Sequence, residues 1–143
     1  MDFFNQEKNV QEYIKMTHVY DNPFFTQLIR KYIPEKTTLL ELGMGPGKDY
    51  DELKNYYTIT GSDTSPVFIN AYKEKHPNAS VKILDAITLE TDKKYNTIYS
   101  NKVLIHLTKD EMKKSVKRQY EILQPNGLIL HTFWKGNKSE SFN

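Results

Sequence analysis

Apolar residues at the start of the chain recur at helical spacing and predict two helices. The apolar face of the first helix consists of Val10, Tyr13, Ile14 and Thr17. The second helix begins with an N-cap residue, Asn22, and with Pro23, whose missing N–H would be unpaired in a first turn anyway. Its apolar stripe is Phe24, Phe25, Leu28, Ile29, Tyr32 and Ile33, before Pro34. We therefore expect residues 1–34 to form a helical N-terminal lid region.

Beyond residue 36 the chain alternates between short β-rich runs and helical segments. The predicted strands cover residues 38–42, 56–60, 81–84, 95–99 and 128–134. Predicted helices lie near 48–54, after the N-cap Ser65, and after a capping box at Thr108 and Glu111. The apolar face of that last helix would consist of Met112, Val116, Tyr120 and Leu123.

Such alternation needs crossover connections between strands, which favour a mainly parallel sheet covered by helices on both faces. The sequence therefore predicts an α/β fold that is Rossmann-like and doubly wound, with about five strands and N-terminal helices. We expect residues 1–143 to form a single domain, with residues 37–134 as its α/β core.

The amino-acid composition excludes several classes of partner and site. There are no cysteines and no run of about 18 apolar residues, and the N-terminus lacks the features of a secretory signal. Twenty basic residues against 18 acidic ones do not make a nucleic-acid footprint. The histidines show no metal-ligand spacing with any carboxylate. We therefore expect a cytoplasmic protein with no metal, membrane or nucleic-acid partner.

The segment Glu41–Gly47 carries the sharpest local signal, because three alternating glycines follow the first predicted strand and precede a helix. Gly43, Gly45 and Gly47 would let the backbone approach a ligand closely, and the helix N-terminus offers unpaired N–H groups. The alternative is that these glycines serve only the turn. Dinucleotide sites need Gly-x-Gly-x-x-Gly, whereas the spacing here is one residue shorter, which disfavours a nicotinamide cofactor.

Two aspartates follow the next two predicted strands, at the sheet edge where ligands bind in such folds. Asp63, twenty residues after Gly43, could accept hydrogen bonds from ribose hydroxyls, or it could cap the helix that follows. Asp85 could accept from an adenine amine, or it could cap a loop. Two acidic residues after successive strands suit a mononucleoside better than a dinucleotide.

From about Tyr13 to Trp134 the chain resembles the class I S-adenosylmethionine-dependent methyltransferases, most closely the small soluble ones that act on small molecules. The motifs that carry the resemblance are residues 41–47, 61–65, 85–86, 100–107 and 123–128. The resemblance implies that the loop Gly43-Met44-Gly45-Pro46-Gly47 passes under the methionine portion of S-adenosylmethionine and that Glu41 buttresses the loop. It also implies that Asp63 holds the ribose hydroxyls and that the adenine is bordered by Thr64, Asp85 and Ala86. The residues implied beside the methionine portion and the transferable methyl are Ser100, Asn101 and Lys102.

Methyl transfer from a sulfonium is an in-line displacement, so alignment of the acceptor matters more than a dedicated catalytic group. His106 is a candidate general base, although the interpretation that it packs or caps before the next helix is favoured. Tyr13 or Tyr20 could cover the sulfonium by cation–π attraction. We expect a small-molecule acceptor. The alternatives are a non-catalytic module that binds a nucleoside or S-adenosylmethionine and, disfavoured by the glycine spacing, an NAD-dependent oxidoreductase.

Members of the family usually continue past the fifth strand into two more strands. This sequence ends about nine residues after Trp134, so we expect the last predicted strand to be an exposed apolar edge of the sheet. Such an edge arises either from truncation or where a partner covers it, for example a second copy in a homodimer.

Overall fold

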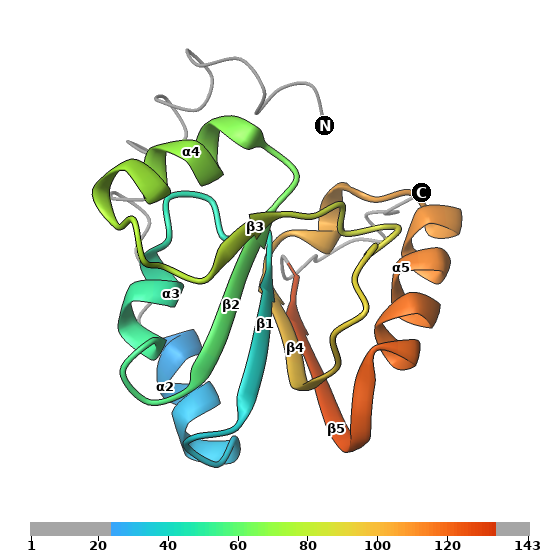
Figure 1. The fold of residues 1–143 in the computed structure, drawn as a ribbon. Coiled ribbons are helices and arrows are strands. Elements are labelled where there is room, and N and C mark those ends of the chain that lie inside the picture. The colour runs from blue at the N-terminus through green and yellow to red at the C-terminus, as the bar shows by residue number, and fades with distance from the viewer. Residues whose placement is uncertain (1–23, 134–143) are drawn as a thin grey trace.

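The computed structural model describes residues 24–133, and its elements alternate between helices and strands (Figure 1). In chain order they are α2 (Phe24–Tyr32), β1 (Thr38–Leu42), α3 (Lys48–Leu53), β2 (Thr58–Asp63), α4 (Pro66–Lys75), β3 (Val81–Ile83), β4 (Tyr95–Asn101), the 3-10 helix η2 (Leu104–His106), α5 (Lys109–Glu121) and β5 (Leu123–Thr132).

Within these residues, five parallel strands form one sheet in the order β3-β2-β1-β4-β5. The chain builds outward from β1 to β3 and then returns to the other side of β1, where β4 pairs with it. Strand order therefore reverses between β1 and β4, which is the position where open α/β sheets bind ligands. The predicted Rossmann-like α/β fold is confirmed.

Helices cover both faces of the sheet: α2, α3 and α4 lie on one side and α5 on the other (Figure 1). Alternation along β1 separates the two cores, because successive strand residues point to opposite faces. Leu39 packs with residues of α2, α3 and α4, including Ile29, Leu53 and Ile69. Leu40 and Leu42 pack on the other face, in a cluster that includes Ile122 at the end of α5.

The predicted strands are confirmed, with shifts of a few residues at their ends. Strand β1 has the predicted bounds, β2 begins two residues later and extends through Asp63, and β5 begins earlier, at Leu123. Both predicted caps are present. The Ser65 side chain accepts from Phe68 N–H, and Thr108 and Glu111 form the reciprocal capping box.

The predicted apolar face of α5 is wrong. Val116 and Tyr120 are 41% and 76% exposed, whereas the polar residues Ser115 and Gln119 are fully buried against the sheet. The helix also ends at Glu121, before Leu123, which begins β5. Its buried face is therefore offset by one residue from the apolar stripe in the sequence.

Helix α2 buries only part of its predicted stripe. Phe25, Ile29 and Ile33 are buried, and the remaining three are exposed: Phe24, Leu28 and Tyr32. The first predicted helix and the predicted cap at residues 22–23 lie outside the described residues. Among residues 24–133, no helix has the length and apolar character needed to cross a membrane.

Candidate cofactor site

The glycine loop follows β1 and ends at the N-terminus of α3, at the carboxyl edge of the sheet. Gly43, Gly45 and Gly47 all have positive φ, at 64°, 54° and 91°. A Cβ atom at Gly43 would lie 2.5 Å from Val103 Cγ2, and one at Gly47 would lie 2.5 Å from Tyr72 Cε2. Both backbone conformation and space therefore require glycine at these two positions.

Asp63 ends β2, and its carboxylate holds the glycine loop. It is 5% exposed, and its two oxygens accept from Gly45 N–H and from Ser65 N–H, each at 2.9 Å. Burial raises the pKa of Asp63, and the two N–H donors counteract that rise. Asp63 is therefore not the cap of α4, which is Ser65, but accepts from the N–H of that cap residue. Each carboxylate oxygen has a second lone pair for another donor.

Glu41 lies in β1, immediately before the loop, and is 3% exposed. Tyr99 O–H donates to its Oε1 at 2.9 Å. Burial, and next the nearby charge of Asp49, raise the pKa of Glu41 well above its ordinary value. The Glu41 backbone carbonyl accepts from Ser62 Oγ, and Met44 N–H donates to the Ser62 carbonyl. These contacts fasten β1 and the loop to β2.

The sequence did not single out Asp49, in the first turn of α3. The Asn101 amide Nδ2 donates to Asp49 Oδ2 at 3.2 Å, which joins the start of α3 to the end of β4. Asn101 Oδ1 in turn accepts from Thr132 Oγ1 in β5. An acidic residue two positions after Gly47 was the available signal, because carboxylates favour the first turn of a helix.

The residues predicted to surround adenine follow β2 and β3. Asp85 is exposed, and its Oδ1 accepts from Ile87 N–H at 2.7 Å, the loop-capping geometry of the alternative interpretation. Ala86 is buried, and its carbonyl accepts from Ser115 Oγ. Thr64 is half-buried between them and α4, with its Oγ1 3.5 Å from the Leu84 carbonyl.

Three predicted residues follow one another at the end of β4, with different orientations. Ser100 is fully buried, and its hydroxyl contacts His131 on the face of the sheet that α5 covers. Lys102 has a φ of 59°, and its N–H donates to the carbonyl and to Oγ1 of Thr132.

The candidate general base, His106, is exposed in η2. Tyr13 lies outside the described residues, as does Tyr20.

The side chain of Met44 is buried, with its Sδ against Gly61 of β2, so within the loop it contributes backbone and packing. The N–H groups of Met44, Gly45 and Gly47 are already paired within the protein, so what the site offers a ligand is three carboxyl groups, those of Glu41, Asp49 and Asp63. Acceptors of this kind suit hydroxyl donors and a cationic group. Among the described residues, no three His, Asp or Glu side chains are grouped to hold a metal ion.

The family described as "Methyltransferase domain" matches residues 39–127. An uncharacterized methyltransferase of Oceanobacillus iheyensis is 30% identical over 94 residues, covering 64% of this chain and 44% of the relative. The trans-aconitate 2-methyltransferase of Variovorax paradoxus is 27% identical over 106 residues, covering 71% of this chain and 40% of the relative. The chain thus spans less than half the length of these relatives.

Solved structures share the fold. The complex titled DhpI-SAM-HEP has a TM-score of 0.77 at 19% identity, covering 96% of this chain and 65% of that one. The N-methyltransferase NodS of Bradyrhizobium japonicum, solved with S-adenosyl-L-homocysteine, has a TM-score of 0.65 at 23% identity, covering 77% of this chain and 62% of that one. Because the family match runs from β1 into β5 and covers more than half of the sequence, the chain belongs to the methyltransferase domain family, and its resemblance to the class I S-adenosylmethionine-dependent enzymes is confirmed.

Proposed function

We propose that this domain binds S-adenosylmethionine at the carboxyl edge of β1, β2 and β4 and transfers its methyl group to a small-molecule acceptor. One observation carries the proposal: the positive-φ glycine loop is fastened by the buried carboxylate of Asp63. Three of the five loop residues, 43–47, carry no side chain, and the carboxylate beside the loop retains lone pairs for hydroxyl donors.

The donors of S-adenosylmethionine match the acceptors of the site. Its ribose has two hydroxyls, which Asp63 would accept. Its methionine portion carries an ammonium beside a sulfonium, and both cations would lie near the carboxyl group of Asp49, with Glu41 buttressing the loop from behind. Asp85, Ala86 and Thr64 would border the adenine ring, and Gly43, Gly45 and Gly47 would pass under the methionine portion, with Met44 supporting the loop.

When bound, the cofactor supplies an activated methyl group on sulfur. The chain's own residues would hold the two reactants in line and exclude water, and such orientation can lower a barrier by roughly 7–11 kcal/mol. Asn101 and Lys102, at the end of β4, would border the methyl. His106, exposed after β4, is the candidate general base. Within the predicted lid region 1–34, α2 packs into the core through Phe25 and Ile29, so the proposed lid over the core 37–134 is limited to the residues before α2, which include Tyr13.

A small-molecule acceptor is supported by the kinds of methyltransferase that share the fold and sequence. The Variovorax relative is named for trans-aconitate, and two structural neighbours are titled as a sugar N-methyltransferase and an amino pentose methyltransferase. We place the protein in the cytoplasm, in keeping with a chain without cysteine.

A second copy of the chain is the proposed partner at the edge of the sheet. Within residues 24–133, β5 pairs with β4 alone, and its Leu128 is 51% exposed. A parallel pair of edges, or an antiparallel one, would satisfy the backbone groups that face away from β4.

Thermal unfolding with S-adenosylmethionine, S-adenosylhomocysteine and NAD in parallel tests the cofactor. A ligand at about 100 times its Kd stabilises by roughly 2.7 kcal/mol, which shifts Tm by several degrees. We expect a shift with the two sulfur compounds and none with NAD. A shift with NAD alone would overturn the proposal, and binding without methyl transfer to any acceptor in a metabolite pool would favour the non-catalytic module.

The substitution Asp63→Asn tests the site within the same assay. It keeps the size of the side chain but loses a charged acceptor, and hydrogen bonds to charged groups contribute about 1.5–3 kcal/mol. We expect at least a tenfold loss of affinity for S-adenosylhomocysteine by calorimetry. Asp92→Asn, in the exposed loop before β4, is the matched control and should bind like the wild type.

A further inference from the structure

A continuous chain of polar side chains crosses from the end of β4, through β5 and α5, to the loop after β3. Ser100 Oγ lies 2.6 Å from His131 Nδ1, and His131 Nε2 lies 2.6 Å from Gln119 Oε1. Gln119 Nε2 donates to Ser115 Oγ at 3.0 Å, and Ser115 Oγ donates to the Ala86 carbonyl at 2.5 Å. We call the four side chains of Ser100, His131, Gln119 and Ser115 the polar relay.

The hydrogens of the polar relay run in a single direction. The Gln119 Oε1 can only accept, so His131 carries its proton on Nε2, and His131 Nδ1 accepts from the Ser100 hydroxyl. Gln119 Nε2 fills an acceptor position of Ser115, which leaves the Ser115 proton for the Ala86 carbonyl. Burial lowers the pKa of His131 to about 4, so its imidazole is neutral near pH 7.

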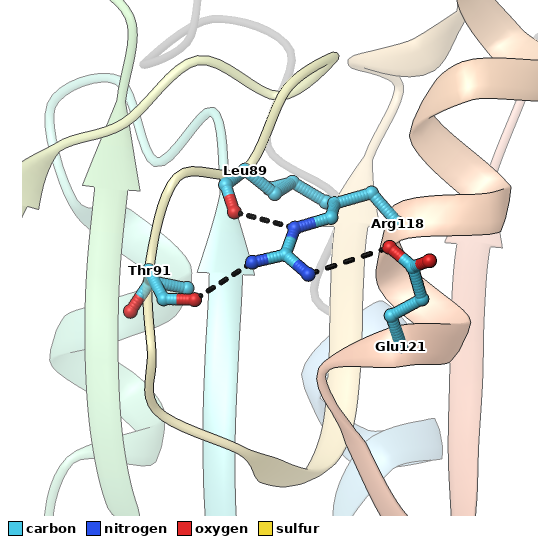
Figure 2. A network of polar contacts seen from close by, with 4 residues as sticks. All are labelled: Leu89, Thr91, Arg118 and Glu121. Atoms are coloured by element: carbon cyan, nitrogen blue, oxygen red, sulfur yellow. Dashed lines mark hydrogen bonds and ion pairs between the residues drawn. The ribbon is translucent and has the colours of Figure 1, made fainter.

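Helix α5 also holds the loop after β3 at two further carbonyls (Figure 2). Arg118 Nε donates to the Leu89 carbonyl at 3.0 Å, and its Nη2 donates to the Thr91 carbonyl at 2.9 Å. Its Nη1 pairs with Glu121 on the same helix. Together with the hydrogen bond from Ser115 to the Ala86 carbonyl, α5 thus donates to three backbone carbonyls of this loop.

Packing alone does not account for the relay. Buried polar groups cost free energy unless each one is paired, and an apolar side chain, that of Ile122, packs into the core directly after α5. A fully connected polar network instead fixes the spacing of the segments that it joins. Its two ends are the segments that would border the adenine, at Ala86, and the methionine portion, at Ser100.

We infer that the polar relay is a positioning device, which sets the distance between the adenine end and the methionine end of the cofactor site. This inference rests on the proposed function. Gln119, in the middle of the relay, is the residue that transmits the constraint, although it is fully buried within α5.

Cutting the relay at its centre tests the inference. Gln119→Met keeps the length of the side chain and removes both hydrogen-bonding atoms. We expect it to weaken S-adenosylhomocysteine binding at least fivefold by calorimetry, at a temperature where circular dichroism shows a folded chain. Ile122→Val, a core change at the residue that follows α5, leaves the relay intact and should change affinity less than twofold.

A double-mutant cycle separates positioning from local structure. Ser100→Ala and Ser115→Ala release opposite ends of the relay, so the double variant should lose at least threefold less affinity than the product of the single losses. In the Gln119→Met background this coupling should vanish. Losses that simply multiply in the wild-type background, as they do for independent sites, would overturn the inference.

Nitrogen NMR of the histidine rings reports the direction of the relay without any ligand. We expect His131 to carry its proton on Nε2 at pH 7, and a proton on Nδ1 would contradict the assigned direction. Absence of S-adenosylhomocysteine binding to the wild-type chain would overturn the proposed function together with the relay's role. Equal binding by the wild type and Gln119→Met would overturn the relay alone.

Discussion

The carboxyl group of Glu41 is buried behind the glycine loop, where Tyr99 donates to it. Burial and the charge of Asp49 raise its pKa well above the ordinary value of 4.5. The folded state therefore holds a proton that the unfolded state releases. The stabilisation that follows is fully present below about pH 4.5 and is lost as the pH rises through the folded-state pKa.

Glu41→Gln should remove this pH dependence, because the amide oxygen still accepts from Tyr99 but the side chain no longer titrates. We expect the free energy of unfolding of the wild type to fall, relative to the variant, as the pH rises above about 4.5. Urea unfolding at a series of pH values measures the difference. Glu35→Gln, at an exposed position, provides the control, and parallel curves for Glu41→Gln and the wild type would contradict the prediction.

Sequence spacing predicted the glycine loop and Asp63, because both depend on residues close to a strand end. The polar relay could not be predicted in that way. Its Ser100–His131 pair arises from the register of β4 against β5, and Gln119 reaches it only because α5 turns its polar face to the sheet. The apolar residues Val116 and Tyr120 had instead predicted that the face of α5 on which they lie would be the buried one.

Strands β1 and β4 are joined near their amino ends by side-chain contacts as well as by backbone pairing. Asn96 Oδ1 accepts from Thr38 N–H at 2.9 Å and from Thr38 Oγ1 at 2.8 Å, and Asn96 N–H donates to that same hydroxyl. These contacts pin the register at the reversal of strand order. The alternation of the sequence predicted both strands, whereas it carried no information about which strands would be neighbours.

Asn96→Ala removes the acceptor for both Thr38 donors and should lower the free energy of unfolding by about 2 kcal/mol, at about 1 kcal/mol for each hydrogen bond. Guanidinium unfolding gives the value. Asn96→Asp keeps a side-chain oxygen in place and should recover most of the loss. A loss of equal size in both variants would show that the hydrogen bonds do not hold the register.

At the scale of the whole molecule, the edge of the sheet formed by β5 carries exposed apolar side chains. They include Leu128 and Phe133, from β5 and the residue after it. If a second copy covers this edge, the wild-type chain sediments as a dimer at micromolar concentration. Leu128→Lys should then shift the chain to a monomer, because a lysine on an edge strand opposes strand addition.

Val116→Lys, an equivalent change on the exposed face of α5, should leave the dimer intact. Sedimentation velocity of the three proteins at matched concentrations distinguishes the outcomes. A wild-type chain that remains monomeric across the concentration range would rule out the homodimer.

The reversal of strand order also has a consequence for the order of folding. Strand β1 meets β2 at a separation of 20 residues, as at Thr38 and Thr58, but it meets β4 at a separation of 58, as at Leu39 and Thr97. Closing the longer loop costs about 0.9 kcal/mol more in chain entropy. We therefore expect the half-sheet from β1 to β3 to form before β4 docks. Because Asn101 and Ser100 arrive only with β4, the candidate site would be completed after its glycine loop is already in place.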